Sequence, residues 1–245
     1  MESKPQPQSR PKPTLLRSLI KLDTAVSLHL YTFFQPILPF YLLKSLELSG
    51  DGRLFFPITI SILFLTTPIA ALTTTPTPAT LLLINLLIGL HLDILLVCLI
   101  KHLIQRPRPV YNKHMFRSFS VDHWSFPSGH SSRVSFVAMF CFFYVNQIRE
   151  ALLVDFLNFD AASWIVEHFV AVVGMWAATT SVSRVLLGRH FVLDVVAGAC
   201  LGVLEGVLVF RVFNYENMRT SGRTVVLDLW TISIFLHLLP PVRSE

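Results

Sequence analysis

Charged residues are scarce in this chain of 245 residues: Asp, Glu, Lys and Arg make up 14% of it, whereas 53% is hydrophobic. The mean hydropathy is +0.59. A typical soluble domain carries roughly 25% charged residues. The scarcity of charge excludes an ordinary soluble enzyme and predicts an integral membrane protein.

Cysteine is also rare. The three cysteines, Cys98, Cys141 and Cys200, lie far apart and each inside an apolar run. Neither a disulfide framework nor a thiolate metal site fits that spacing. We interpret all three as residues of the apolar interior.

The chain has no nucleic-acid-binding motif. Its net charge of +5 would suit RNA or DNA, but the cations fall between hydrophobic runs and form no basic patch. Phosphate groups and lipid headgroups are the expected partners, together with the bilayer itself, and we predict no nucleic acid as a partner.

Long hydrophobic runs are abundant. Five of them approach the length of about 20 residues that crosses the hydrocarbon core of a bilayer: Leu54–Thr75, Ala79–Ile100, Ser131–Ile148, Trp164–Val182 and Phe191–Phe210. A shorter run, Val225–Leu239, either spans the membrane or lies along its surface. The predicted fold is therefore all-α, a multi-spanning transmembrane helical bundle of about five to six spans, with its core at residues 54–213 and a C-terminal tail at 214–245.

The N-terminal part differs from this core. Residues 1–13 contain four prolines and little that is apolar, which predicts a disordered tail. From Thr14 to Phe34, apolar residues recur at helical spacing against polar residues that include Lys21, Asp23 and His29. This pattern predicts an amphipathic helix in the membrane interface, and we assign residues 14–53 to an interfacial helical segment.

Three polar stretches interrupt the hydrophobic runs. They are Lys101 followed at an interval of six residues by Arg108-Pro109, then Pro127-Ser128-Gly129-His130, then Ser183-Arg184 followed by His190 and Asp194. With five alternating spans, each stretch falls at a helix end on the same side of the membrane. The sequence therefore predicts that the three stretches meet in one site.

The third stretch sets a guanidinium, an imidazole and a carboxylate at fixed spacing. If a helix begins near Gly188, Asp194 lies one turn above His190, where it can hold one ring nitrogen and leave the other free to attack. The planar fork of Arg184 suits two oxygens of a phosphate beside that nucleophile. These three residues favour phosphoryl transfer.

These residues also fit two other interpretations. His190 and Asp194 could be metal ligands on one helical face, although the cations nearby disfavour a divalent ion. Ser128 and His130 could belong to a serine hydrolase triad with an Asp, but the chain has no Gly-x-Ser-x-Gly elbow.

Together, the pattern Lys-x6-Arg-Pro, Pro-Ser-Gly-His and Ser-Arg-x5-His-x3-Asp resembles the signature of the type 2 phosphatidic acid phosphatase superfamily, with every fixed position present. Flanking residues such as Ser120-Val121-Asp122 and Leu187-Gly188 resemble its polyisoprenoid (presqualene) diphosphate phosphatase branch, which includes the plant lipid phosphate phosphatase beta type.

The resemblance implies a membrane lipid phosphatase that needs no metal and no other cofactor and that hydrolyses a phosphate monoester or an isoprenoid diphosphate. It implies that His190 is the nucleophile and forms a phosphohistidine, that Asp194 orients it, and that His130 is the general acid. The residues that it implies for phosphate binding are Lys101, Arg108, Ser128, Gly129 and Arg184.

Arg106, Arg133 and Arg189 are cations beyond those of the signature. We predict that they contact a second phosphate, which would favour isoprenoid diphosphates over phosphatidate. Asp93, with His91, lies inside the second predicted span, where an ionisable group needs a partner. We interpret Asp93 as a structural polar contact between helices.

Two other functions compete with this reading: a phosphatidate phosphatase of broad specificity, and a non-catalytic membrane protein that binds lipid phosphates. Lys and Arg are concentrated in the segments predicted on the active-site side, so the positive-inside rule places the site on the cytoplasmic face. We expect the endoplasmic reticulum as the membrane. The oligomeric state stays open.

Overall fold

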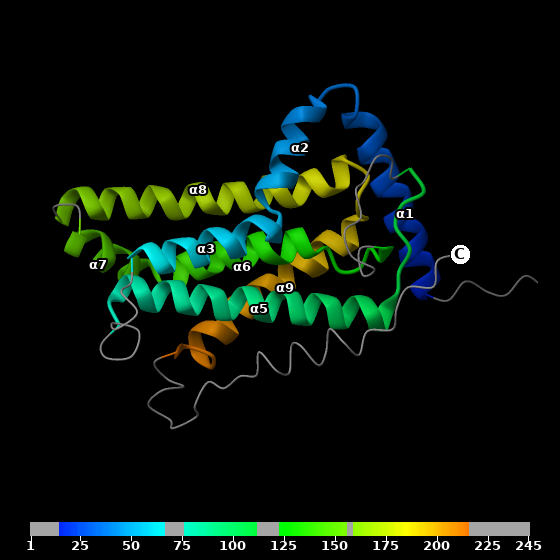
Figure 1. Ribbon diagram of the computed structural model, residues 1–245. Coiled ribbons are helices and arrows are strands. Elements are labelled where there is room, and N and C mark those ends of the chain that lie inside the picture. The colour runs from blue at the N-terminus through cyan, green and yellow to red at the C-terminus, as the bar shows by residue number, and fades with distance from the viewer. Residues whose placement is uncertain (1–14, 67–75, 112–122, 156–158, 216–245) are drawn as a thin grey trace, which may run out of the picture.

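The computed structural model describes residues 15–66, 76–111, 123–155 and 159–215, and these residues form a bundle of α-helices (Figure 1). The helices are α1 (Leu15–Phe34), α2 (Phe40–Ser49), α3 (Gly52–Thr66), α5 (Pro78–Ile104), α6 (Gly129–Phe143), α7 (Val145–Asp155), α8 (Phe159–Leu186) and α9 (Val192–Arg211). Within the described ranges, β pairing is limited to one isolated bridge between Pro107 and Trp124. The all-α membrane bundle is confirmed. The predicted tail at 1–13 and the run Val225–Leu239 lie outside the described residues.

By length and composition, three of the described helices can cross a membrane: α5, the Trp164–Leu186 part of α8, and α9. The pair α2 and α3, bent by 47° at its break, counts as a fourth if it forms one span. This is fewer than the five to six spans that the sequence predicts. The predicted span Ser131–Ile148 is one cause, because its helix α6 has only 15 residues and ends at Phe143. The hydrophobic run continues past Phe143, but α6 ends there and a separate helix, α7, begins at Val145.

A break at Tyr144 separates α6 from α7. Helix α7 runs to Asp155 and α8 begins at Phe159, so residues 149–155 and 159–163, which lie between the third and fourth predicted spans, are helical.

Close contact between α6 and α9 forms the centre of the bundle. Gly198, Gly202 and Gly206 recur every four residues on α9 and face α6, where a Cβ at Gly198 or Gly202 would overlap the backbone of Ser128 or Ser132. Small residues at this spacing allow two helix backbones to approach closely inside a membrane. Their approach brings the first turns of α6 and α9 side by side.

Aromatic packing fills the bundle at the other end of α6. Leu90, Phe136, Phe140, Tyr144 and Val209 form one buried cluster. The Phe140 and Tyr144 rings stack with their centroids 4.4 Å apart. This cluster joins α5, α6 and α9 away from the polar stretches.

A buried ion pair joins α5 and α6 between these two ends. Arg133 Nη2 lies 2.9 Å from Asp93 Oδ2, and Asp93 is fully buried. A charged pair satisfies groups that would be costly alone at this depth. The interpretation of Asp93 as a polar contact between helices is confirmed.

Helices α1 and α2 lie at one end of the bundle, and α7 lies at the other (Figure 1). The end with α1 and α2 also holds the connections 105–111, 123–128 and 187–191. All three polar stretches of the sequence therefore gather there.

Candidate active site

A tight turn between α8 and α9 positions the nucleophile candidate. Gly188 has φ +67°, a left-handed conformation that favours glycine, and a side chain there would also meet the Tyr111 ring. After the turn, the amides of Arg189 and His190 both donate to the carbonyl of Arg184, at 2.9 and 3.2 Å. The turn thus folds the imidazole back over the end of α8, beside Arg184.

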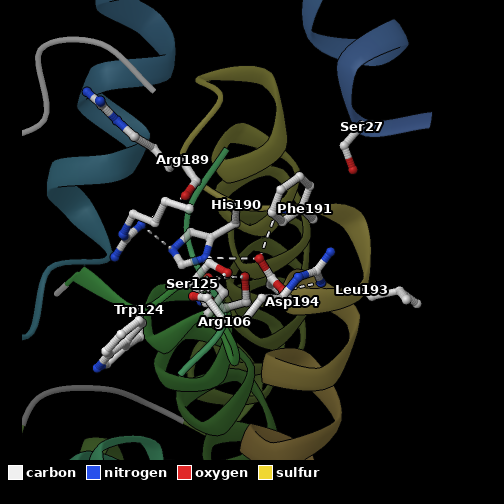
Figure 2. A network of polar contacts seen from close by, with 12 residues as sticks. Ser27, Arg106, Trp124, Ser125, Arg189, His190, Phe191, Leu193 and Asp194 are labelled. Atoms are coloured by element: carbon white, nitrogen blue, oxygen red, sulfur yellow. Dashed lines mark hydrogen bonds and ion pairs between the residues drawn. The ribbon is translucent and has the colours of Figure 1, made fainter. Parts of the chain in front are cut away.

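The His190 ring is buried and held on both sides (Figure 2). Its Nδ1 lies 2.7 Å from the Ser125 carbonyl oxygen, and its Nε2 lies 3.1 Å from Arg108 Nη1. A carbonyl oxygen can only accept, so the hydrogen-bond network assigns the proton to Nδ1. The lone pair of Nε2 is then directed toward Arg108.

The expected hydrogen bond between Asp194 and His190 does not form. Asp194 Oδ2 lies 3.7 Å from Nδ1, beyond hydrogen-bond distance. The reason is that α9 begins at Val192 and not near Gly188, so His190 precedes the helix and Asp194 falls in its first turn. There Asp194 Oδ2 accepts from the Phe191 amide at 2.9 Å and Oδ1 accepts from Arg106 Nη1 at 2.6 Å.

Sequence reasoning missed Ser125 as the partner of Nδ1, although it stands just before the Pro-Ser-Gly-His stretch. The residue is fixed by the segment after α5. Its amide donates to the Arg106 carbonyl at 2.7 Å and its hydroxyl to the Pro107 carbonyl at 3.1 Å. Lys101 Nζ donates to the neighbouring Trp124 carbonyl at 2.9 Å. These bonds tie the first and second polar stretches to the His190 ring.

Cations surround the imidazole. Burial lowers the pKa of His190 well below its ordinary value of 6.5, and the positive charges of Arg108, Arg184 and Lys101 lower it further, as does His130. The ring is therefore neutral at physiological pH. A neutral imidazole is the form that can act as a nucleophile.

His130 stands in the first turn of α6. The helix is capped by Ser128, whose hydroxyl accepts from the Ser131 amide, and the Ser128 amide donates to the Asp194 carbonyl at 2.9 Å. The Nε2 atom of His130 is buried without a hydrogen-bond partner among the described residues. A buried polar atom of this kind calls for a ligand or a water molecule.

Glu47 of α2 reaches into the same site and is a second residue that sequence reasoning missed. Its Oε1 lies 2.6 Å from Nη1 of the fully buried Arg184 and 3.4 Å from Nε of Arg189. Its Oε2 lies 2.6 Å from Lys44 Nζ. The carboxylate therefore lies where an anionic ligand of Arg184 would bind.

The three additional arginines all face carboxylates. Arg106 lies between Asp23 and Asp194 at 2.6 Å from each, Arg133 pairs with Asp93, and Arg189 adjoins Glu47. Arg106 and Arg133 thus hold helices together. Arg189 is the one whose carboxylate partner comes from the α2 segment above the site.

The arrangement of these residues agrees with the family comparison. The model of the PAP2 superfamily matches residues 82–218, more than half of the chain and all three polar stretches. The chain belongs to the PAP2 superfamily. It is 38% identical over 209 residues to the probable lipid phosphate phosphatase beta of Arabidopsis thaliana, an alignment that covers 82% of this chain and 92% of the plant protein.

The fold of this PAP2 protein resembles the crystal structure of a transmembrane PAP2-type phosphatidylglycerolphosphate phosphatase from Bacillus subtilis. The TM-score is 0.57 at 25% identity, and the match covers 78% of this chain and 84% of the bacterial one. The PAP2 protein described here is accordingly an integral membrane lipid phosphate phosphatase, a hydrolase of phosphoric esters of the metal-independent type.

Proposed function

We propose that this PAP2 phosphatase removes phosphate from its lipid through a phosphohistidine formed at Nε2 of His190. The contact between His190 Nδ1 and the Ser125 carbonyl oxygen is the observation that carries the proposal. The Ser125 carbonyl fixes the proton on Nδ1, so the nucleophilic lone pair points toward Arg108 and the other cations. A phosphoryl group held by those cations meets the lone pair directly.

In the first step, the Nε2 lone pair forms a bond to phosphorus while the bond from phosphorus to the leaving oxygen breaks. That oxygen is the alcohol oxygen of a phosphate monoester or the bridging oxygen of a diphosphate, which leaves as the lipid monophosphate. His130, in the imidazolium form that the negative charge of the bound phosphate stabilises, gives its proton to that leaving oxygen. Its buried Nε2, which has no partner among the described residues, is the atom available for this transfer. In the second step, His130 takes a proton from water, whose oxygen attacks the phosphohistidine and releases inorganic phosphate.

The phosphate contacts in this proposal come from Lys101, Arg108, Ser128, Gly129 and Arg184. The first turn of α6 supplies backbone amides for an anion. Arg184 becomes available when the substrate phosphate replaces the Glu47 carboxylate. A phosphate dianion carries more negative charge than one carboxylate, which favours the exchange.

An isoprenoid diphosphate is the substrate that we propose within this class. Arg189 is the additional cation that we propose for the second phosphate, because Arg106 and Arg133 are engaged in ion pairs inside the protein. Glu47 faces both Arg184 and Arg189. The two phosphates of a diphosphate can take both guanidiniums when Glu47 leaves, whereas a monophosphate is expected to hold one.

The substrate proposal is tested by measuring phosphate release from purified protein with phosphatidate, farnesyl diphosphate, geranylgeranyl diphosphate and presqualene diphosphate, with and without chelator. We expect higher kcat/KM for the diphosphates, no effect of chelator, and a smaller preference in Arg189→Ala. Equal or better turnover of phosphatidate would show a broad phosphatidate phosphatase instead. Binding of the lipids without any phosphate release would show a non-catalytic binding protein.

The membrane and the orientation are also part of the proposal. The concentration of Lys and Arg around the site supports a cytoplasmic active site, and the endoplasmic reticulum is the proposed organelle. An N-terminal tag should be accessible to antibody after selective permeabilisation of the plasma membrane alone. Accessibility only after the organelle membrane is opened would reverse the orientation.

A further inference from the structure

Helix α1 has an inverted pattern of burial. Its two buried residues are polar, Asp23 and Ser27, and they lie one helical turn apart on the same face. Large apolar residues along the helix are exposed instead: Leu15, Leu16, Leu19, Ile20, Leu22, Val26, Leu28 and Phe33. The helix therefore docks on the protein through polar atoms and leaves its apolar side chains for lipid.

The polar atoms of α1 bind the start of α9. Ser27 Oγ accepts from the Val192 amide at 2.9 Å, and Asp23 Oδ1 accepts from the Leu193 amide at 3.0 Å. Amides in the first turn of a helix have no acceptor within their own helix. The N-cap residue of α9 is Phe191, which offers no side-chain acceptor, so α1 provides the caps from outside.

The second oxygen of Asp23 extends the contact to the His190 site. Asp23 Oδ2 lies 2.6 Å from Arg106 Nη2, and Arg106 Nη1 lies 2.6 Å from Asp194 Oδ1. The Arg106 guanidinium also covers the Phe191 ring, 4.1 Å from its centroid. Asp23 of α1 thus contacts Arg106, and Arg106 contacts Phe191, the residue that follows His190.

We infer that Asp23 and Ser27 are positioning residues for His190, acting by capping α9 and by clamping Arg106 against Asp194. Both lie outside residues 82–218, which match the family model. The backbone from Phe191 to Leu193 is fixed by Asp194, Ser27 and Asp23 in turn. The placement of the preceding imidazole against Ser125 and Arg108 depends on that backbone.

This inference rests on the proposed role of His190, so its test begins with wild-type protein that forms the phosphoenzyme. The variants are Asp23→Asn, which keeps an acceptor for Leu193 but loses the charge facing Arg106, Ser27→Ala, and Ser27→Thr, which keeps the hydroxyl. The matched control is Thr24→Ala, because Thr24 is exposed on the same helix and its hydroxyl donates to the Ile20 carbonyl at 2.8 Å.

We expect Asp23→Asn and Ser27→Ala to lower kcat and the rate of phosphoenzyme formation by about 10- to 100-fold, the loss typical of a small misplacement of reacting groups. KM and the thermal midpoint should change little, Ser27→Thr should recover most of kcat, and Thr24→Ala should match wild type. Wild-type kcat in both variants would overturn the inference, as would losses that only follow the folded fraction.

A failure of the function proposal looks different, because wild-type protein would then turn over substrate without a phosphoenzyme at His190. If Asp23→Asn folds poorly, the comparison of Ser27→Ala with Ser27→Thr decides the matter. Equal kcat in these two variants would count against positioning by α1.

Discussion

The two ends of α6 differ in the residues that they bury: polar residues beside the candidate active site at its beginning, and aromatic residues at its end. At its beginning, Ser128, Ser131, Ser132 and Arg133 are buried polar residues, whereas Phe136, Phe140 and Tyr144 fill the following turns with aromatic rings. The polar end lies against the first turn of α9 and the His190 site. Among the described residues, the buried aromatic cluster at the other end includes none of the residues of that site. Changes at the polar end should therefore affect activity, and changes at the aromatic end should affect stability.

The largest difference is expected at Arg108. Arg108→Ala removes the guanidinium 3.1 Å from His190 Nε2, and loss of one such charge-stabilising group costs about 100- to 1,000-fold in kcat. The thermal midpoint in lipid-detergent micelles should stay near that of wild type. Arg211→Ala, an exposed arginine at the far end of α9, is the matched control for activity. An equally large loss of activity in Arg211→Ala would contradict the view that activity depends on the polar end of the bundle.

The reverse effect is expected at Phe140. Phe140→Ala opens a cavity in the aromatic cluster and should destabilise the protein by about 3–5 kcal/mol. Turnover per folded molecule should be near wild type. Denaturation curves and active-site titration measure the two quantities separately. Phe142→Ala serves as control because its ring is 58% exposed, and a lower turnover per folded Phe140→Ala molecule would mean that the two ends are coupled.

Gly202 offers a way to disturb both ends together. A side chain there overlaps the Ser132 backbone, so Gly202→Val must push α6 away from α9. We expect a destabilisation of about 1–3 kcal/mol from overpacking together with a lower kcat. Gly174→Val on α8 is the matched control, because a Cβ there meets no atom within 4 Å. Wild-type stability in Gly202→Val would contradict the close approach of the two helices.

The smallest effect concerns pH. The folded-state pKa of His190 lies below 6.5 through burial and the nearby cations, so the ring contributes stability above about pH 6.5 that is lost as pH falls. The acid limb of kcat/KM assigned to His190 should move to higher pH in Arg108→Gln, because one lowering charge is gone. A comparison with the same substrate cancels the titration of the substrate itself. A limb that stays in place or moves to lower pH would contradict the electrostatic account.

The polar end of the bundle could be predicted from the sequence because its residues stand in contiguous motifs at helix ends. Lys101, Arg108, His130 and His190 lie at one end of the bundle, as the position of their motifs beside the ends of helices predicts. The partners of these residues could not be found in that way. Ser125, Asp23 and Glu47 contact the site across large sequence separations, and the spacing of the three polar motifs includes none of them.

The fold shows the same division. Hydropathy located α5, α8 and α9, because an apolar run of full length leaves little choice. Hydropathy predicted a helix that continues to Ile148, whereas α6 ends at Phe143, because composition does not reveal the break at Tyr144. The cations beyond the family signature also led to the prediction that Arg106 and Arg133 contact a second phosphate, whereas the structure pairs them with Asp194 and Asp93. A sequence shows which residues are charged, but the partner of each charged residue depends on how the helices pack.

The covalent intermediate tests the central claim most directly. Protein is mixed with a radiolabelled phosphate ester that has a good leaving group, quenched in base, and assayed for bound label. The account predicts an acid-labile, base-stable phosphoprotein in wild type, none in His190→Ala, wild-type amounts in the exposed control His168→Ala, and accumulation in His130→Ala because its hydrolysis lacks a base. Label that persists in His190→Ala, or turnover in that variant at the wild-type rate, would contradict the account.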